Sequence, residues 1–209
     1  MPTTDNKGLL IVISAPSGGG KTTLCNQLLT TYQNTVRAIT CTTRKPRDGE
    51  QDRVDYFFLS PATFLENVQA GNFIEHATVY GNSYGTLKSE VLSKLRRGND
   101  VLLSVDVQGA ATIKQKVVED VELNSALLSI FLAPQSISIL EQRLQKRNQD
   151  SSTTIRERLA VARQEISQSV NFDYIIVSGS IGEDLSSMRS IIVAEKMRQC
   201  RTLLPSYDE

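Results

Sequence analysis

Four short apolar runs divide this chain and predict its buried strands: residues 9–13, 101–106, 126–132 and 174–177. Runs that are apolar at nearly every position are typical of parallel strands covered on both faces. Stretches that favour helices lie around them, at residues 22–31, 110–118, 137–147, 154–170 and 183–199. Because strands and helices alternate, the pattern predicts an α/β fold with a parallel sheet flanked by helices.

Two stretches break this alternation. Residues 36–85 contain short strands at 56–59 and 73–79 around a helix, which Ser60 and Pro61 should begin and Gly71 should end. A small α+β insertion is expected here. Residues 145–154 are polar and lie between two helices, which predicts a mobile surface segment.

A glycine-rich motif follows the first apolar run and precedes a helix. Strand, loop, Lys-Thr and helix together predict a phosphate-binding loop, with an ordinary glycine-rich turn as the alternative. Glycine lets backbone N–H groups turn toward an anion, and the helix start adds free donors. Lys21 would reach the outer phosphates, and Thr22 would offer its hydroxyl to the Mg²⁺ of a nucleoside triphosphate. The motif consists of Ala15, Pro16, Ser17, Gly18, Gly19, Gly20, Lys21, Thr22 and Thr23.

An arginine-rich loop, residues 42–50, is a candidate second anion site. Arg44, Lys45 and Arg47 lie within four residues, and a proline and a glycine shape this stretch as a loop rather than a helix. The guanidinium group offers a planar fork of donors that matches phosphate oxygens. A solvated charged turn is the alternative.

Glu75 is a candidate for recognition of a base. Guanine presents adjacent N1–H and N2–H donors on one edge, and a carboxylate accepts both at once. A buried Glu without such partners would be costly, whereas an exposed Glu at a strand edge is the alternative. We expect Gly81 and Gly85 to frame a turn that holds Tyr84, and His76 to be a surface or structural residue rather than a catalyst.

Three arginines near the polar segment are candidates for contacts to a transferring phosphate. Arg143 and Arg147 lie four residues apart on one helical face, and Arg158 follows on the next helix. These side chains would converge on phosphate when the segment closes. An ordinary charged helix surface is the alternative.

Composition narrows the class of protein. The 209 residues suit one domain, and 23 basic against 23 acidic side chains give no general attraction to nucleic acid or to an acidic membrane. Cys25, Cys41 and Cys200 are expected to be small buried hydrophobes without disulfides, and a single histidine excludes a His-rich metal site. No apolar run has the length of a membrane span and the first residues lack a signal-peptide pattern, so a cytoplasmic location is expected.

Taken together, the motifs resemble the guanylate kinase family. They occur in order at residues 14–23, 42–50, 55–58, 75–77, 81–86 and 106–110, and the likeness extends from about residue 9 to residue 197. The resemblance implies transfer of the γ-phosphoryl group of ATP to GMP with Mg²⁺, on a sheet of the P-loop NTPase type. It also implies a core of residues 1–35, 86–140 and 160–209, a GMP-binding insertion at about 36–85 and a mobile lid at about 141–159.

The resemblance implies three groups of site residues. The ATP phosphates would contact the motif from Ala15 to Thr23, with Thr22 as the magnesium ligand. Catalysis would rest on Lys21, Arg44, Arg143, Arg147 and Arg158. GMP would contact Thr40, Arg44, Arg47, Glu50, Tyr56, Glu75, Tyr84, Thr86 and Asp106. The implied substrates are ATP and GMP, with no nucleic acid or membrane partner, and the choice between monomer and homo-oligomer stays open.

The chain departs from the family pattern at three points. Ser104 stands where the family has the first carboxylate of Asp-x-Asp, while Asp106 keeps the second. Residues 178–180 read Ser-Gly-Ser where Asn-Asp-Asp is common, and Asn148 stands in place of a glycine. These departures bear on rate and affinity more than on the class of reaction.

Two other functions share parts of this pattern. A kinase for a different small acceptor would keep the phosphate-binding loop and lack the base contacts of Glu75 and Thr40. A non-catalytic guanylate-kinase-like module that binds peptides or phosphoproteins would typically lose Lys21 and parts of the nucleotide site. Lys21, Thr22 and Arg44 are all present, which favours the enzyme.

Overall fold

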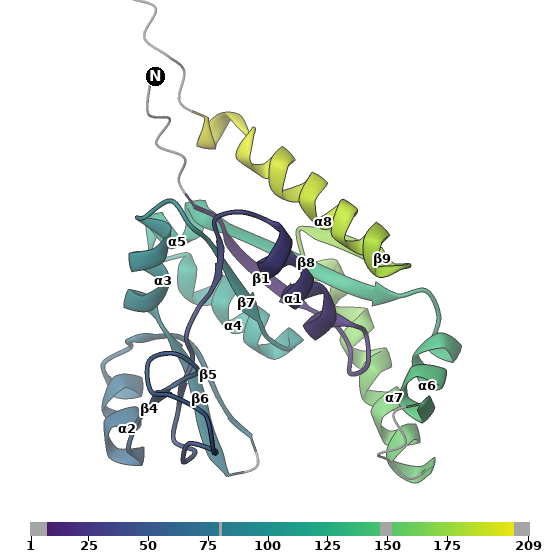
Figure 1. Ribbon diagram of the computed structural model, residues 1–209, viewed down its shortest axis with the longest axis horizontal. Helices are drawn as coiled ribbons and strands as arrows, with labels where there is room; N and C mark the ends of the chain where they lie inside the picture. The colour runs from purple at the N-terminus through teal and green to yellow at the C-terminus, as the bar shows by residue number, and fades with distance from the viewer. Residues whose placement is uncertain (1–7, 80, 147–151, 203–209) are drawn as a thin grey trace, which may run out of the picture.

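A central sheet of five parallel strands organises the fold, in the order β2–β7–β1–β8–β9 (Figure 1). The structure is a computed structural model that describes residues 8–79, 81–146 and 152–202. The strands of this sheet are β1 (Leu10–Ser14), β2 (Thr35–Arg37), β7 (Asp100–Ser104), β8 (Leu127–Pro134) and β9 (Tyr174–Ser178). The four strands that the apolar runs predicted are confirmed, each within two residues at either end.

Residues of β1 alternate between two hydrophobic layers. Ile11 and Ile13 pack in the layer of α1 and α8, whereas Leu10 and Val12 pack in the layer of α3, α4 and α5. The sheet is therefore covered on both faces, which explains why its strands are almost continuously apolar. These helices are α1 (Lys21–Thr31), α3 (Lys88–Leu95), α4 (Val107–Val117), α5 (Val121–Ala126) and α8 (Ile181–Lys196).

A second lobe, at the lower left of Figure 1, is built on a four-stranded sheet in the order β4–β3–β6–β5. Its elements are β3 (Cys41–Thr42), β4 (Phe57–Phe58), α2 (Pro61–Gln69), β5 (Phe73–Val79) and β6 (Asn82–Leu87). Ser60 begins α2 as predicted, since its Oγ accepts a hydrogen bond from the Thr63 backbone N–H at 3.0 Å. Cys41, Phe64 and Phe73 form the buried centre of this lobe. Val36, which the expected insertion included, lies in β2 of the central sheet.

A helical hairpin forms the lobe at the lower right of Figure 1. It consists of α6 (Ile137–Lys146) and α7 (Ser152–Ser167), and the 3-10 helix η1 (Gln168–Asn171) follows α7. Leu140 and Leu144 of α6 pack against Ile155, Leu159 and Ala162 of α7. The hairpin thus has a hydrophobic cluster of its own. How the chain divides into core, insertion and lid remains our prediction.

Two sequence expectations are wrong. Tyr84 and Gly85 lie within strand β6 rather than in a turn, because β6 pairs with both β5 and β3. A Cβ on Gly85 would lie 3.0 Å from the Cβ of His76, so this glycine permits close approach of the two strands. Cys200 is exposed, whereas Cys25 and Cys41 are buried as expected.

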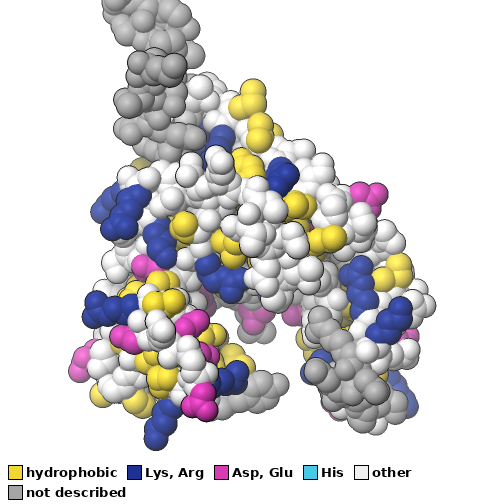
Figure 2. Space-filling view, viewed as in Figure 1, with side chains coloured by type: hydrophobic (Ala, Val, Ile, Leu, Met, Phe, Trp, Pro, Cys, Tyr) yellow, Lys and Arg dark blue, Asp and Glu magenta, His cyan; other side chains and the backbone are white. Residues whose placement is uncertain are grey.

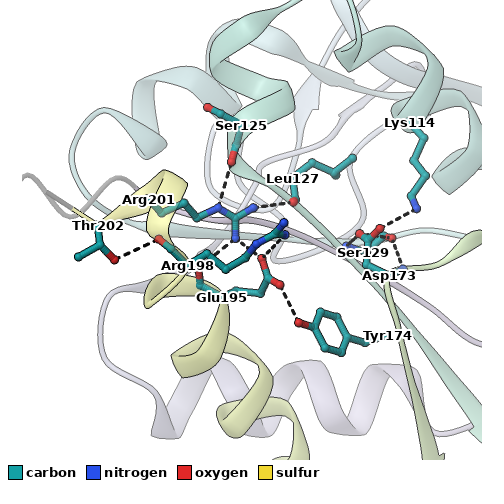
Figure 3. A network of polar contacts seen from close by, with 10 residues as sticks. All are labelled: Lys114, Ser125, Leu127, Ser129, Asp173, Tyr174, Glu195, Arg198, Arg201 and Thr202. Carbon is teal, nitrogen blue, oxygen red and sulfur yellow. Dashed lines mark hydrogen bonds and ion pairs between the residues drawn. The ribbon is translucent and has the colours of Figure 1, made fainter.

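A buried network at the amino edge of the sheet fastens the end of α8 and the 3-10 helix η2 (Gln199–Arg201) to the core (Figure 3). The carboxylate of Glu195 accepts hydrogen bonds from Tyr174 Oη at 2.7 Å, from Arg198 and from Arg201. Arg201 also donates to the carbonyl oxygens of Ser125 and Leu127. No helix within the described ranges is long and apolar enough to cross a bilayer.

We expect Tyr174→Phe to lower the free energy of unfolding by about 1–2 kcal/mol, because it removes one hydrogen bond to a buried carboxylate. Urea unfolding followed by circular dichroism measures this change. Tyr32→Phe is the matched control, since Tyr32 is also half-buried but its hydroxyl makes no hydrogen bond to a described residue. Equal stability of the two variants would contradict this role of the Tyr174 hydroxyl.

Candidate active site

The glycine-rich motif forms a tight loop between β1 and α1. The Gly19 N–H donates to the Pro16 carbonyl oxygen at 2.8 Å, which closes the turn. Gly18 and Gly20 have φ values of 84° and 95°, a left-handed conformation that L side chains rarely adopt. The loop then feeds directly into α1, whose first N–H groups have no partner within the helix. The unpaired N–H groups and the positive end of the α1 dipole therefore lie together at the loop, which is the arrangement of an anion-binding site.

Lys21 links the loop to the end of the neighbouring strand β7. Its Nζ donates to the Val105 carbonyl oxygen at 2.5 Å. Burial lowers the pKa of Lys21, while the nearby carboxylates of Asp106 and Glu165 oppose that shift. An anionic ligand at the loop would supply the counter-charge that this half-buried ammonium group needs.

Thr22 and Thr23 lie at the start of α1 with exposed side chains. A hydroxyl in this position suits Mg²⁺, which is typically held by one or two protein oxygens together with substrate phosphates and water. Among the described residues, no three His, Cys, Asp or Glu side chains gather into a dedicated metal site. The hydroxyl of Thr22 thus suits a Mg²⁺ ion that arrives bound to a nucleotide.

Asp106 follows β7 and caps α4, where its Oδ1 accepts a hydrogen bond from the Gly109 N–H at 2.7 Å. Its carboxylate is exposed and is close enough to Lys21 and Glu75 to act on the pKa of both. Ser104, at the end of the same strand, is exposed. Asp106 therefore lies between the glycine-rich loop and the second lobe, and Ser104 brings no second carboxylate there.

The arginine-rich loop folds around Glu50. Arg44 Nη2 lies 2.8 Å and 3.0 Å from the two carboxylate oxygens of Glu50, and the Arg47 backbone N–H donates to the same carboxylate. The hydrogen bond with Glu50 raises the pKa of Arg44 and lowers that of Glu50. Glu50 thus acts here on the shape of the loop and the position of Arg44. The side chain of Arg47 is exposed.

Two tyrosines complete this arginine site. The guanidinium carbon of Arg44 lies 5.5 Å from the ring centroid of Tyr56, and Tyr84 is close enough to Arg44 to contribute to its raised pKa after Glu50. The rings of Tyr56 and Tyr84 meet edge to face, with centroids 6.3 Å apart. The tertiary fold therefore gathers one arginine and two hydroxyls from three separate segments, a combination that suits a phosphate group.

Glu75 is buried, with 9% of its surface exposed, so the exposed alternative is wrong. Its Oε1 accepts a hydrogen bond from Thr86 Oγ1 at 2.9 Å, across the β5–β6 pair. Burial raises the pKa of Glu75, and the like charge of Asp106 adds to this, while Thr86 and Lys116 oppose it. Thr40 lies half-buried just before β3, and its carbonyl oxygen accepts from the Phe57 N–H at 3.0 Å.

The helical hairpin contacts the glycine-rich loop. A Cβ on Gly18 would lie 3.1 Å from Leu144 and 3.2 Å from Leu140, and one on Gly20 would lie 3.9 Å from Arg143 Nη1. Arg143 therefore reaches the loop from α6. Arg158 lies half-buried on α7, whereas Arg147 and Asn148 lie outside the described residues.

Between the second lobe and the hairpin the surface is hollowed, as Figure 2 shows at the lower edge of the molecule. This hollow is an open cleft. A separate depression, also open to solvent, lies along the exposed face of α8 and is lined by Leu185, Arg189 and Val193. Two sites for anionic groups thus face one cleft, one at the parallel sheet and one on the second lobe. This arrangement defines a phosphotransferase of the P-loop class.

Comparisons with known proteins identify the family. The guanylate kinase family model matches residues 7–195. The chain is 41% identical to a guanylate kinase of Rickettsia bellii and 43% identical to one of Coxiella burnetii; these alignments cover 94% and 93% of this chain, and 99% and 91% of the relatives. The crystal structure of guanylate kinase from Anaplasma phagocytophilum matches with a TM-score of 0.70 and 31% identity, over 97% of this chain and 93% of that one.

The chain belongs to the guanylate kinase family. The activity of this family is the ATP-dependent phosphorylation of GMP to GDP, a transferase reaction of purine nucleotide metabolism. The resemblance inferred from the ordered motifs is therefore confirmed, as is the α/β fold with a parallel central sheet.

Val105 and Glu165 are contacts of the site that the sequence did not indicate. Val105 acts through its carbonyl oxygen, which every residue possesses, so no residue-type pattern identifies it. Glu165 lies in a helix whose charges read as an ordinary solvated surface. Only the packing of the chain brings its carboxylate close enough to Lys21 for each to act on the pKa of the other.

Proposed function

We propose that this cleft transfers the γ-phosphoryl group of ATP to GMP, with the glycine-rich loop as the donor site and the second lobe as the acceptor site. The observation that carries the proposal is the burial of Glu75 beside Thr86, on the same β5–β6 pair that carries Tyr84 of the arginine and tyrosine site. A buried carboxylate matches the paired donors of guanine better than the edge of adenine, which offers fewer adjacent donors.

The donor site uses the backbone N–H groups of residues 17–20, the charge of Lys21 and the hydroxyl of Thr22. In this assignment Mg²⁺ would be held by Thr22 together with the phosphates, and it would neutralise charge on the β- and γ-phosphoryl groups when bound. Lys21 would leave the Val105 carbonyl oxygen for the phosphate oxygens, which are a stronger acceptor for an ammonium group.

The acceptor site positions the phosphate of GMP. Arg44, Tyr56 and Tyr84 would hold this phosphate, and Glu50 would keep the guanidinium group in place. Glu75, Thr86 and Thr40 would contact the base, and Arg47 would close over the phosphate from its exposed position. Because the acceptor phosphate is already ionised, catalysis requires alignment and charge neutralisation more than a general base.

The hairpin arginines would complete the site. Arg143 already lies beside Gly20, and closure of the hairpin would bring Arg158 and Arg147 toward the transferring group while excluding water. A cytoplasmic location is proposed from the family alone.

The test of the function is a coupled ADP-release assay of the full chain with ATP and, in turn, GMP, AMP, CMP, UMP and dTMP. We expect turnover with GMP and background rates with the others. Equal rates with all five nucleotides would favour a kinase that acts on a different small acceptor. No turnover with any of the five would favour a non-catalytic guanylate-kinase-like module.

We expect removal of divalent ions with excess EDTA to reduce turnover to background, because ATP phosphates then lack their counter-charge. Added Mg²⁺ should restore the rate. GMP binding, measured by calorimetry without ATP, should survive EDTA, since the acceptor site consists of arginine, tyrosine and glutamate side chains. Full turnover in EDTA would remove Mg²⁺ from the proposal.

A further inference from the structure

The chain crosses between the central sheet and the second lobe twice. It leaves β2 through a connecting segment, residues 38–40, that leads into β3, and it returns from β6 directly into α3. The second lobe is therefore attached to the central sheet through these two crossings. Thr40, which we assign to the base of GMP, is the last residue of the connecting segment.

Two side chains of α3 hold the connecting segment. Glu90 Oε1 accepts a hydrogen bond from the Ile39 backbone N–H at 3.0 Å, and Lys94 Nζ donates to the Arg37 carbonyl oxygen at 2.8 Å. Lys94 Nζ also lies 2.6 Å from the same oxygen of Glu90, and only 13% of the Glu90 side chain and 20% of the Lys94 side chain are exposed. Because the two residues are about one helical turn apart, they reach the segment from one face of α3.

Thr40 lies between the Glu90–Lys94 pair and the proposed base site. Strand β3 pairs with β6 in antiparallel register, with Cys41 opposite Gly85. The next position of this register brings Thr40 opposite Thr86, whose hydroxyl donates to the buried carboxylate of Glu75. The residue just before Thr40 is the one whose N–H group is held by α3. The position of Thr40 is thus determined from both sides, by the strand pairing and by α3.

We propose that Glu90 and Lys94 are positioning residues for recognition of the base, which fix the connecting segment and so hold Thr40 opposite Thr86 before GMP binds. This inference rests on the proposed function and on the proposed role of Thr40 in it. A site that is already in its binding geometry has a higher apparent affinity than one that adopts this geometry only part of the time. The pair should therefore act on the affinity for GMP and leave the ATP site on β1 and α1 unchanged.

The test compares Glu90→Ala with Glu90→Gln in the full chain. Glu90→Ala removes the acceptor for the Ile39 N–H, and the Kd for GMP, measured by calorimetry without ATP, should rise about 5- to 20-fold, part of the stabilisation from one charge-assisted hydrogen bond. Glu90→Gln keeps an acceptor oxygen, so its Kd should lie within about threefold of the parent value. In both variants the KM for ATP and the kcat at saturating GMP should change less than about threefold.

A second substitution tests whether Glu90 acts through Thr40. In a Thr40→Val background the hydroxyl proposed to contact the base is absent, so Glu90→Ala should raise the Kd for GMP by less than about twofold further. A full 5- to 20-fold rise in that background would overturn the inference. An unchanged Kd in Glu90→Ala, equal losses in the Ala and Gln variants, or an equal rise in the KM for ATP would overturn it as well.

Two further variants separate this role from a general loss of structure. Glu122→Ala breaks the Arg96–Glu122 ion pair of the same helix, which is largely exposed and distant in sequence from the connecting segment, and it should leave the Kd for GMP unchanged. Lys94→Met keeps the side-chain length and removes the charge, so it should raise the Kd about threefold; it decides the question if Glu90→Ala does not fold, and an unchanged Kd would then overturn the inference. Failure of the proposed function is distinct, since the parent chain itself would then not bind GMP.

Discussion

Lys21→Ala is expected to abolish measurable turnover while the protein stays folded. The ammonium group of Lys21 is the charge that we assign to the outer phosphates, and its loss should lower kcat by at least about 10²- to 10³-fold, the scale of removing one preorganised donor. Folding should not suffer, because the lowered pKa of Lys21 shows that burial disfavours its charged form. Alanine removes that cost along with the hydrogen bond to Val105.

The coupled ADP-release assay measures the rate, and thermal unfolding measures the stability. Lys21→Met is the companion variant, since it keeps an unbranched chain of similar length without the charge and should be as inactive. Arg97→Ala removes an exposed cation at the end of α3 and should behave as the parent chain does. Near-normal turnover of Lys21→Ala would refute the assignment of the donor site.

Glu75→Gln is expected to weaken the preference for GMP by at least about 30-fold in kcat/KM, or roughly 2 kcal/mol, because a buried donor would then face the donors of the guanine edge. The hydrogen bond with Thr86 can persist, since the amide oxygen still accepts from the Thr86 hydroxyl. The loss should therefore appear in base selectivity rather than in folding. Steady-state kinetics with GMP and AMP measure it.

Glu66→Gln is the matched control for this change. Glu66 lies exposed on α2 of the same lobe, so the same substitution there should leave selectivity intact. The rate at saturating ATP and GMP should also distinguish Lys21, which we assign to the donor site, from Glu75, which we assign to the base. Lys21 variants should remain slow at every GMP concentration. An unchanged preference for GMP over AMP in Glu75→Gln would remove Glu75 from recognition of the base.

Local signals explain which elements were predictable. The buried strands and α1 are marked by continuous apolar runs and by the glycine-rich motif, and α2 is marked by Ser60 and Pro61. In contrast, β2 and β3 contain three and two residues, too few to show a periodic pattern. The helix α3 was not predicted at all, since its N-cap Leu87 makes no side-chain cap hydrogen bond and offers no capping signal.

The sequence by itself determined the donor loop, because residues 15–23 are consecutive and their chemistry is local. It also determined the family, because the motifs keep their order along the chain. Only the tertiary structure decided that Glu75 is buried against Thr86, that Glu50 holds Arg44 and that Leu140 and Leu144 meet the loop at Gly18. Each of these depends on strand pairing, loop closure or helix packing. Burial and partner choice arise from packing across the whole chain, which no single stretch of residues contains.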